Sequence, residues 1–208
     1  MNKMLVGIDL DNTILDYSIV LIKMAEFLNL KVPVSGYDKA VFKTSVISEF
    51  SESHWTKLQA LIYGPMSLEA RIFPGFPEFI ELISKKGWDY SIISHRSVLA
   101  AGDTSIKLQE YAKLAISRIL KGVIDEDKIF FGCSFEQKIR IITDQRCDIF
   151  IDDLQSVVDE LSYSKHDIFT VQFDPSVNIV NVRPTGARIG NWFGVASIIE
   201  EMTWSKKC

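Results

Sequence analysis

The chain of 208 residues is long enough to bury a substantial apolar core, and its 47% hydrophobic and 24% charged residues are ordinary for a globular protein. The formal net charge of -4 and the pI of about 5.4 argue against a nucleic-acid partner, because domains that bind nucleic acids are usually basic. A small anionic ligand is compatible with this negative net charge, since a local site can be positive on an acidic protein.

Nothing in the sequence resembles a membrane or export signal. No apolar run reaches the roughly 18 residues of a membrane span, and the first residues lack a long apolar segment followed by a small-residue cleavage site. We therefore expect a cytoplasmic protein with no membrane partner. The three cysteines, Cys133, Cys147 and Cys208, are odd in number and form no close pair, so neither a disulfide framework nor a zinc knuckle is indicated.

Short apolar segments alternate with amphipathic ones along most of the chain. The expected strands are residues 4–10, 90–94, 129–132, 148–152 and 168–173, and the expected helices are 77–86, 105–120, 135–143 and 154–162. Near-continuous apolar strands are typical of parallel sheets that are covered on both faces. The alternation predicts an α/β fold with right-handed crossovers.

One stretch interrupts this alternation. Between about residues 17 and 72 no segment resembles a strand, and helical patterns cover 17–30, 37–50 and 52–63. We interpret 17–72 as a helical insert, with 1–16 and 73–208 forming the core domain. Core statistics favour burial of the insert's aromatic residues, Phe27, Phe42 and Trp55.

Carboxylates lie where two of the expected strands end. Asp9 and Asp11 lie at the end of the first, where ligands bind in open α/β folds. Asp152 and Asp153 lie at the end of the fourth. If the two strands are neighbours, repulsion among these groups requires a cation, and an all-oxygen ligand set favours Mg²⁺. The alternatives are a polar turn after the first strand and a helix N-cap after the fourth.

Two further positions could contact a phosphate. Ser94 ends the second strand and His95 follows it, although Ser94 could equally cap the next segment. Lys138 lies on a short expected helix between the third and fourth strands. It could neutralise a phosphate as a point cation, or it could be an ordinary surface lysine. Spacing alone does not decide between these alternatives.

Together these segments resemble the haloacid dehalogenase (HAD) superfamily, specifically its phosphatase branch. The first motif is similar to the family's DxDxT form and reads Asp9-Leu10-Asp11-Asn12-Thr13. Ser94 resembles the second motif, Lys138 (with Lys128 as the fallback) the third, and Asp152-Asp153 the acidic pair of the fourth. The insert lies where the family places a helical cap of the first type. The resemblance implies a Rossmann-like core with helices on both faces.

The resemblance also implies chemical roles. Asp9 would attack the phosphorus and Asp11 would act as acid and then base, while Ser94, His95 and Lys138 would bind the phosphoryl group. Mg²⁺ would be held by Asp9, the backbone carbonyl of Asp11, and the Asp152-Asp153 pair, with Asp152 favoured as the direct ligand. Thr13 would order the turn after Asp11.

The expected activity is therefore hydrolysis of a small phosphorylated metabolite through an aspartyl-phosphate. A phosphomutase of the same superfamily and a non-catalytic binding module are the alternatives. The identity of the substrate and the oligomeric state stay open. Arg71, near the end of the insert, could recognise a second anionic group of the substrate, although a solvated surface arginine is the more common case.

Overall fold

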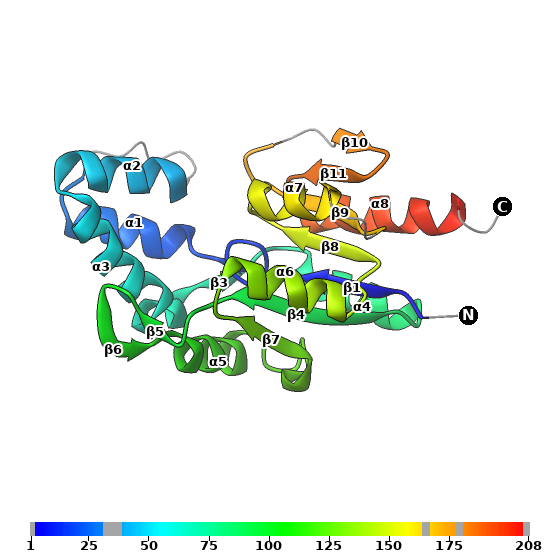
Figure 1. Cartoon of the computed structure of the whole chain (residues 1–208), viewed down its shortest axis with the longest axis horizontal. Helices are drawn as coiled ribbons and strands as arrows, with labels where there is room; N and C mark the ends of the chain where they lie inside the picture. The colour runs from blue at the N-terminus through cyan, green and yellow to red at the C-terminus, as the bar shows by residue number, and fades with distance from the viewer. Residues whose placement is uncertain (1–2, 31–38, 164–166, 178–180, 206–208) are drawn as a thin grey trace. The chain divides into compact units, whose positions relative to one another are not determined.

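The computed structural model describes residues 3–30, 39–163, 167–177 and 181–205, and their packing forms two compact units (Figure 1). The core unit comprises Met1–Ile14, Phe73–His95 and Val123–Cys208, and the insert unit comprises Leu15–Ile72 and Arg96–Gly122. The insert unit thus contains the expected stretch 17–72, but also a second segment that the sequence analysis assigned to the core. Four points of the chain, rather than two, connect the units.

A seven-stranded sheet forms the middle of the core unit, in the order β10-β11-β9-β8-β1-β4-β7. All its described pairings are parallel except that of β10 with β11. The bounds are β1 Leu5–Ile8, β4 Asp89–His95, β7 Ile129–Gly132, β8 Ile149–Asp152, β9 Phe169–Phe173, β10 Asn181–Arg183 and β11 Gly186–Ile189. The predicted α/β class and the five predicted strands are confirmed. The pair β10 and β11 was not predicted, because both strands are short and lack an apolar run.

Helices cover both faces of this sheet (Figure 1). On one face α6 (Phe135–Asp144) and α7 (Gln155–Tyr163) pack on a core cluster that includes Phe150, Ile142 and Leu161. On the other face α4 (Phe76–Lys85) packs beside α8 (Trp192–Ser205). A 3-10 turn, η2 (Glu126–Lys128), leads into β7. Within the described ranges, no helix has both the length and the hydrophobicity of a membrane span.

The insert unit is mainly helical but also contains short strands. Its elements are β2 Leu15–Asp16, α1 Ser18–Phe27, α2 Lys39–Glu49, α3 Glu52–Tyr63, η1 Pro65–Glu69, β3 Arg71–Ile72, β5 Leu99–Ala100, β6 Asp103–Lys107 and α5 Leu108–Ile119. The first two residues predicted for the second helix, 37 and 38, lie outside the described residues. The prediction that no strand lies within 17–72 is wrong at Arg71, because β3 pairs antiparallel with β2.

The helix predicted over 105–120 begins three residues late. The Asp103 side chain accepts hydrogen bonds from both the backbone N–H and the hydroxyl of Ser105, at 2.9 and 2.6 Å. Such local side-chain bonds compete with helical ones. Ser105 therefore belongs to the β5–β6 hairpin, and α5 starts at Leu108.

Two of the three insert aromatics are buried as predicted. Phe42 and Trp55 are almost inaccessible and meet edge to face, with ring centroids 6.1 Å apart. The prediction is wrong for Phe27, which is 78% exposed at the last position of α1.

Candidate active site

The candidate site lies at the carboxyl ends of three neighbouring parallel strands. β1 pairs with β4 on one side and with β8 on the other, which places Ile8 opposite Ile92 and Ile151. Asp9 continues β1 by donating its backbone N–H to the Ile151 carbonyl at 2.9 Å. The central neighbour relationship between the two carboxylate-bearing strands is therefore confirmed.

A buried ion triad joins β1, β8 and α6. The Lys138 ammonium lies 2.5 Å from Asp9 Oδ1 and 2.6 Å from Asp152 Oδ2. All three residues are buried, with Lys138 only 1% exposed. Lys138 lies near the start of helix α6. Ser134 caps the first turn of this helix, because the Ser134 hydroxyl accepts the Gln137 N–H. Lys138 is thus no surface lysine.

Lys128, the fallback lysine, lies at the amino ends of the strands, opposite to the carboxyl ends where Asp9 lies. Lys128 Nζ is 2.7 Å from Asp89 Oδ1, and Asp89 begins the strand β4 that ends next to Ser94, at His95. A side chain at the amino end of β4 cannot reach a group at its carboxyl end. Of the two candidate lysines, Lys138 is therefore the one that lies beside Asp9.

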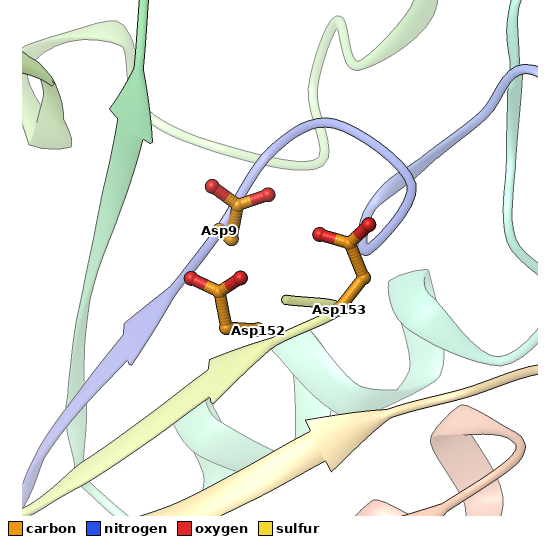
Figure 2. Close-up of side chains that lie close together, drawn as sticks. All are labelled: Asp9, Asp152 and Asp153. Carbon is orange, nitrogen blue, oxygen red and sulfur yellow. The ribbon is translucent and has the colours of Figure 1, made fainter. Parts of the chain in front are cut away.

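Three carboxylates gather where β1 and β8 end (Figure 2). One oxygen each from Asp9, Asp152 and Asp153 lies within 4.8 Å of the others, a spacing that could hold a metal ion. Asp152 Oδ1 also accepts the Leu154 N–H at 2.9 Å, so the N-cap-like contact and the cluster coexist. Asp152 Oδ2 faces the Lys138 ammonium at 2.6 Å, and this contact helps to raise the pKa of the lysine.

A tight turn carries the chain from Asp9 past Asp11. Asn12 adopts a left-handed backbone with φ of 61°, which asparagine tolerates better than most residues, and Ile14 N–H closes the turn on the Leu10 carbonyl at 3.0 Å. Thr13 is fully buried, and its hydroxyl accepts the Asp153 N–H at 3.1 Å. The turn after the first motif is therefore tied directly to the fourth.

Ser94 and His95 differ in their surroundings. Ser94 is buried, and its hydroxyl lies 3.4 Å from Asp11 Oδ2, longer than an ordinary O–H···O hydrogen bond. His95 is the last residue of β4 and is exposed. The structure thus brings Ser94 to Asp11, whereas His95 makes no described hydrogen bond to the carboxylate cluster.

Burial and charge shift the acid–base properties of the triad. Burial raises the pKa of Asp9 well above its ordinary value, Lys138 acts against this shift, and Asp152, Asp153 and Asp11 add to it. Burial alone would lower the pKa of Lys138, but Asp9 and Asp152 raise it above its ordinary value. The lysine is therefore permanently charged, and additional positive charge would favour the ionised form of Asp9.

Sequence reasoning missed Gly132, the last residue of β7. A Cβ at this position would lie 2.7 Å from the Lys138 backbone nitrogen and 3.0 Å from its Cα. Only a glycine lets α6 approach closely enough for Lys138 to reach Asp9. The signal in the sequence was a glycine at a strand end before a short helix, a pattern that also marks ordinary turns.

No protein-family model and no curated protein matches the sequence. Solved structures share its fold. A haloacid dehalogenase-like protein of unknown function from Agrobacterium tumefaciens is 14% identical with a TM-score of 0.61, over 97% of this chain and 100% of that one. The HAD-hydrolase YfnB from Bacillus subtilis, described as bound to magnesium, is 13% identical with a TM-score of 0.60, over 95% and 99%.

A HAD hydrolase of family IA, variant 3, from Entamoeba histolytica is 13% identical with a TM-score of 0.56, over 92% of this chain and 94% of that one. At such identities the likeness shows the fold. The chain has the fold of the HAD hydrolases, as its four sequence motifs predicted.

Proposed function

We propose that this chain is a Mg²⁺-dependent phosphomonoesterase that forms an aspartyl-phosphate on Asp9. The observation that carries the proposal is the buried contact of Lys138 with Asp9 and Asp152, in a cluster that also contains Asp153. Such a cluster is costly unless it binds charged ligands. The shared HAD fold supports a hydrolase.

The roles of the individual side chains follow from their positions. Asp9 attacks the phosphorus as a carboxylate, and the phosphate ester oxygen leaves with a proton from Asp11. Asp11 then takes a proton from the water that hydrolyses the aspartyl-phosphate. Lys138 and Ser94 bind the oxygens of the transferring phosphoryl group, where negative charge is stabilised during the reaction. His95 is an exposed neighbour that could contact the same group.

The residues present fit a magnesium ion. The cluster offers oxygen ligands alone, and Lys138 balances one of the three carboxylate charges of Asp9, Asp152 and Asp153 when all are ionised, which leaves the charge of a divalent cation. The Asp11 backbone carbonyl would complete the protein ligands. When bound, Mg²⁺ would keep Asp9 ionised and offset its repulsion from a phosphate dianion.

The contacts of Asp152 and Asp153 favour different roles for the two carboxylates. Asp152 uses Oδ1 for the Leu154 N–H and Oδ2 for Lys138, so its charge is already compensated. We therefore propose Asp153 as the direct ligand and Asp152 as the group that holds Lys138. This reverses the order suggested by the sequence motif.

The insert unit is proposed to act as a cap that excludes water during attack and opens for product release. Because four chain connections join it to the core unit, one of them directly after His95, it would move as a block built from two sequence segments. Arg71, exposed on β3, is a candidate for recognising a second anionic group.

A phosphatase differs measurably from the alternatives. Purified protein should release phosphate from p-nitrophenyl phosphate with Mg²⁺ and lose this activity in EDTA. A mutase would need a bisphosphate activator, and a dehalogenase would act on a haloacid instead of a phosphate ester. A binding module would turn over none of these compounds. Asp11 speaks against a dehalogenase, because the resemblance implies that such enzymes lack an acid there.

Asp9→Asn is the decisive variant. An amide cannot form the aspartyl-phosphate, so we expect kcat to fall at least about a thousandfold, while Lys138 keeps its contact with Asp152 and the fold survives. Asp144→Asn, at an exposed position on the same helix as Lys138, is the matched control and should be fully active. Near-normal turnover by folded Asp9→Asn would refute the mechanism.

A further inference from the structure

Thr13 links the first motif to two distant parts of the core unit. Its hydroxyl accepts the Asp153 N–H at 3.1 Å, and its carbonyl oxygen accepts the indole N–H of Trp192, also at 3.1 Å. Both Thr13 and Trp192 are completely buried. A single residue of the turn thus connects the acidic pair after β8 with the first residue of α8.

The indole of Trp192 has a fixed orientation. Its ring contacts Phe76, Phe79 and Phe173, with centroids 5.0, 4.9 and 5.3 Å away. Its Cβ lies 3.1 Å from the position that a Cβ on Gly75 would occupy. The ring cannot turn without displacing several buried aromatic side chains, so its N–H points steadily at the Thr13 carbonyl.

This contact satisfies both partners. A buried indole N–H is only a donor and needs an acceptor, while a buried carbonyl on a tight turn needs a donor. The turn also contains Asn12 in the left-handed region, a conformation that persists when the surroundings determine it. Asp11 precedes this residue and Thr13 follows it. Fixing Thr13 therefore restricts both Asp11 and Asp153.

We propose that Trp192 is a positioning residue of the candidate site, whose hydrogen bond to the Thr13 carbonyl holds the Asp11 turn and Asp153 in register with Asp9. The inference rests on the proposed Mg²⁺-dependent phosphatase function. Trp192 touches neither metal nor phosphate and acts through Thr13. Its removal changes metal affinity and turnover, whereas substrate binding at saturating Mg²⁺ is left intact.

Trp192→Phe tests this role because it keeps an aromatic ring and removes the N–H. We expect Mg²⁺ binding, measured by isothermal titration calorimetry without substrate, to weaken about fivefold, the factor typical of one lost hydrogen bond. With p-nitrophenyl phosphate at saturating Mg²⁺, kcat should fall and KM should stay unchanged. Phe79→Leu is the control, because it loosens the same aromatic cluster without touching the indole bond.

The outcomes separate positioning from stability. Phe79→Leu should lower Tm and keep the Mg²⁺ affinity of the wild type. If Trp192→Phe lowers Tm and likewise keeps that affinity, Trp192 is structural only and the proposal is overturned. A wild-type protein that binds no Mg²⁺ contradicts the proposed function itself, and the role of Trp192 with it.

Thr13 variants extend the test to the other half of the link, should Trp192→Phe fail to fold. Thr13→Val removes the hydroxyl that accepts the Asp153 N–H, and Thr13→Ser retains it. We expect weakened Mg²⁺ binding in the valine variant and recovery in the serine variant. Equal Mg²⁺ binding by wild type and Thr13→Val would mean that the link transmits nothing, which also overturns the proposal.

Discussion

The Nζ atom of Lys138 lies 2.5 Å from Oδ1 of Asp9, although 129 positions of the sequence separate the two residues. The contact is buried, so both charges have left water, and it places a permanent ammonium beside the proposed nucleophile. Because burial removes the screening that weakens surface ion pairs, this pair should matter both for folding and for phosphate binding.

Lys138→Met should strongly destabilise the metal-free protein. The variant leaves Asp9 and Asp152 buried without a cation, and breaking such a pair costs about 3–5 kcal/mol of unfolding free energy. Urea unfolding in EDTA measures this loss. Lys128→Met is the matched control, since its partly exposed pair with Asp89 should contribute less than about 1 kcal/mol. Equal losses in both variants would contradict the buried triad.

Gly132→Ala should disturb the site through packing alone. The added methyl would lie 2.7 Å from the backbone nitrogen of Lys138, so α6 must shift, with an overpacking cost of about 1–3 kcal/mol. We expect a lower Tm together with reduced kcat. Gly122→Ala is the comparison: its φ of 76° is strained for alanine but nothing lies within 4 Å, so Tm should fall without loss of activity. Unaltered turnover in Gly132→Ala would contradict the close approach.

The thiols should differ in reactivity with pH. Burial, with a smaller effect of Asp148, raises the pKa of Cys147 to about 12, whereas Cys133 is exposed. In a Cys208→Ser background at pH 8, a thiol reagent should modify Cys133 quickly and Cys147 only after denaturation. Rapid modification of Cys147 in the folded protein would contradict its burial.

The same thiol makes stability depend on pH. Its folded-state pKa lies above the ordinary value of 9.0, so the stabilisation linked to Cys147 is complete below pH 9 and is lost as the pH rises towards 12. Urea titrations between about pH 8 and 11 measure this loss. The free energies of unfolding of wild type and Cys147→Ala should become more similar as the pH increases.

Arg71→Ala tests whether the insert unit selects substrates. If Arg71 recognises a second anionic group, kcat/KM should fall about tenfold or more for bisphosphates and sugar phosphates with a carboxylate, and stay unchanged for p-nitrophenyl phosphate. Arg118→Ala, on the exposed side of α5, is the matched control. An unchanged panel of kcat/KM values would assign Arg71 to the solvated surface.

The sequence by itself determined the fold class and predicted most residues of the candidate site. Apolar strands that end in Asp9, Ser94 and Asp152 predicted a parallel sheet with its polar residues at one edge, because hydrophobic patterning and strand polarity are local properties. Core statistics predicted the burial of Phe42 and Trp55 in the insert, and they failed for Phe27, which is exposed at the last position of α1, because such statistics do not report where along a helix the packing ends.

Tertiary structure decided what depends on contacts between distant segments. Lys138 and Lys128 look alike in the sequence, and only the packing of α6 against β4 and β7 places one of them beside Asp9. Likewise, residues 96–122 pack with the insert, and Trp192 meets Thr13 from the far end of the chain. Side-chain periodicity reports which face of an element is buried, but not which partner covers it, because that choice is made by shape and by pairing over the whole chain.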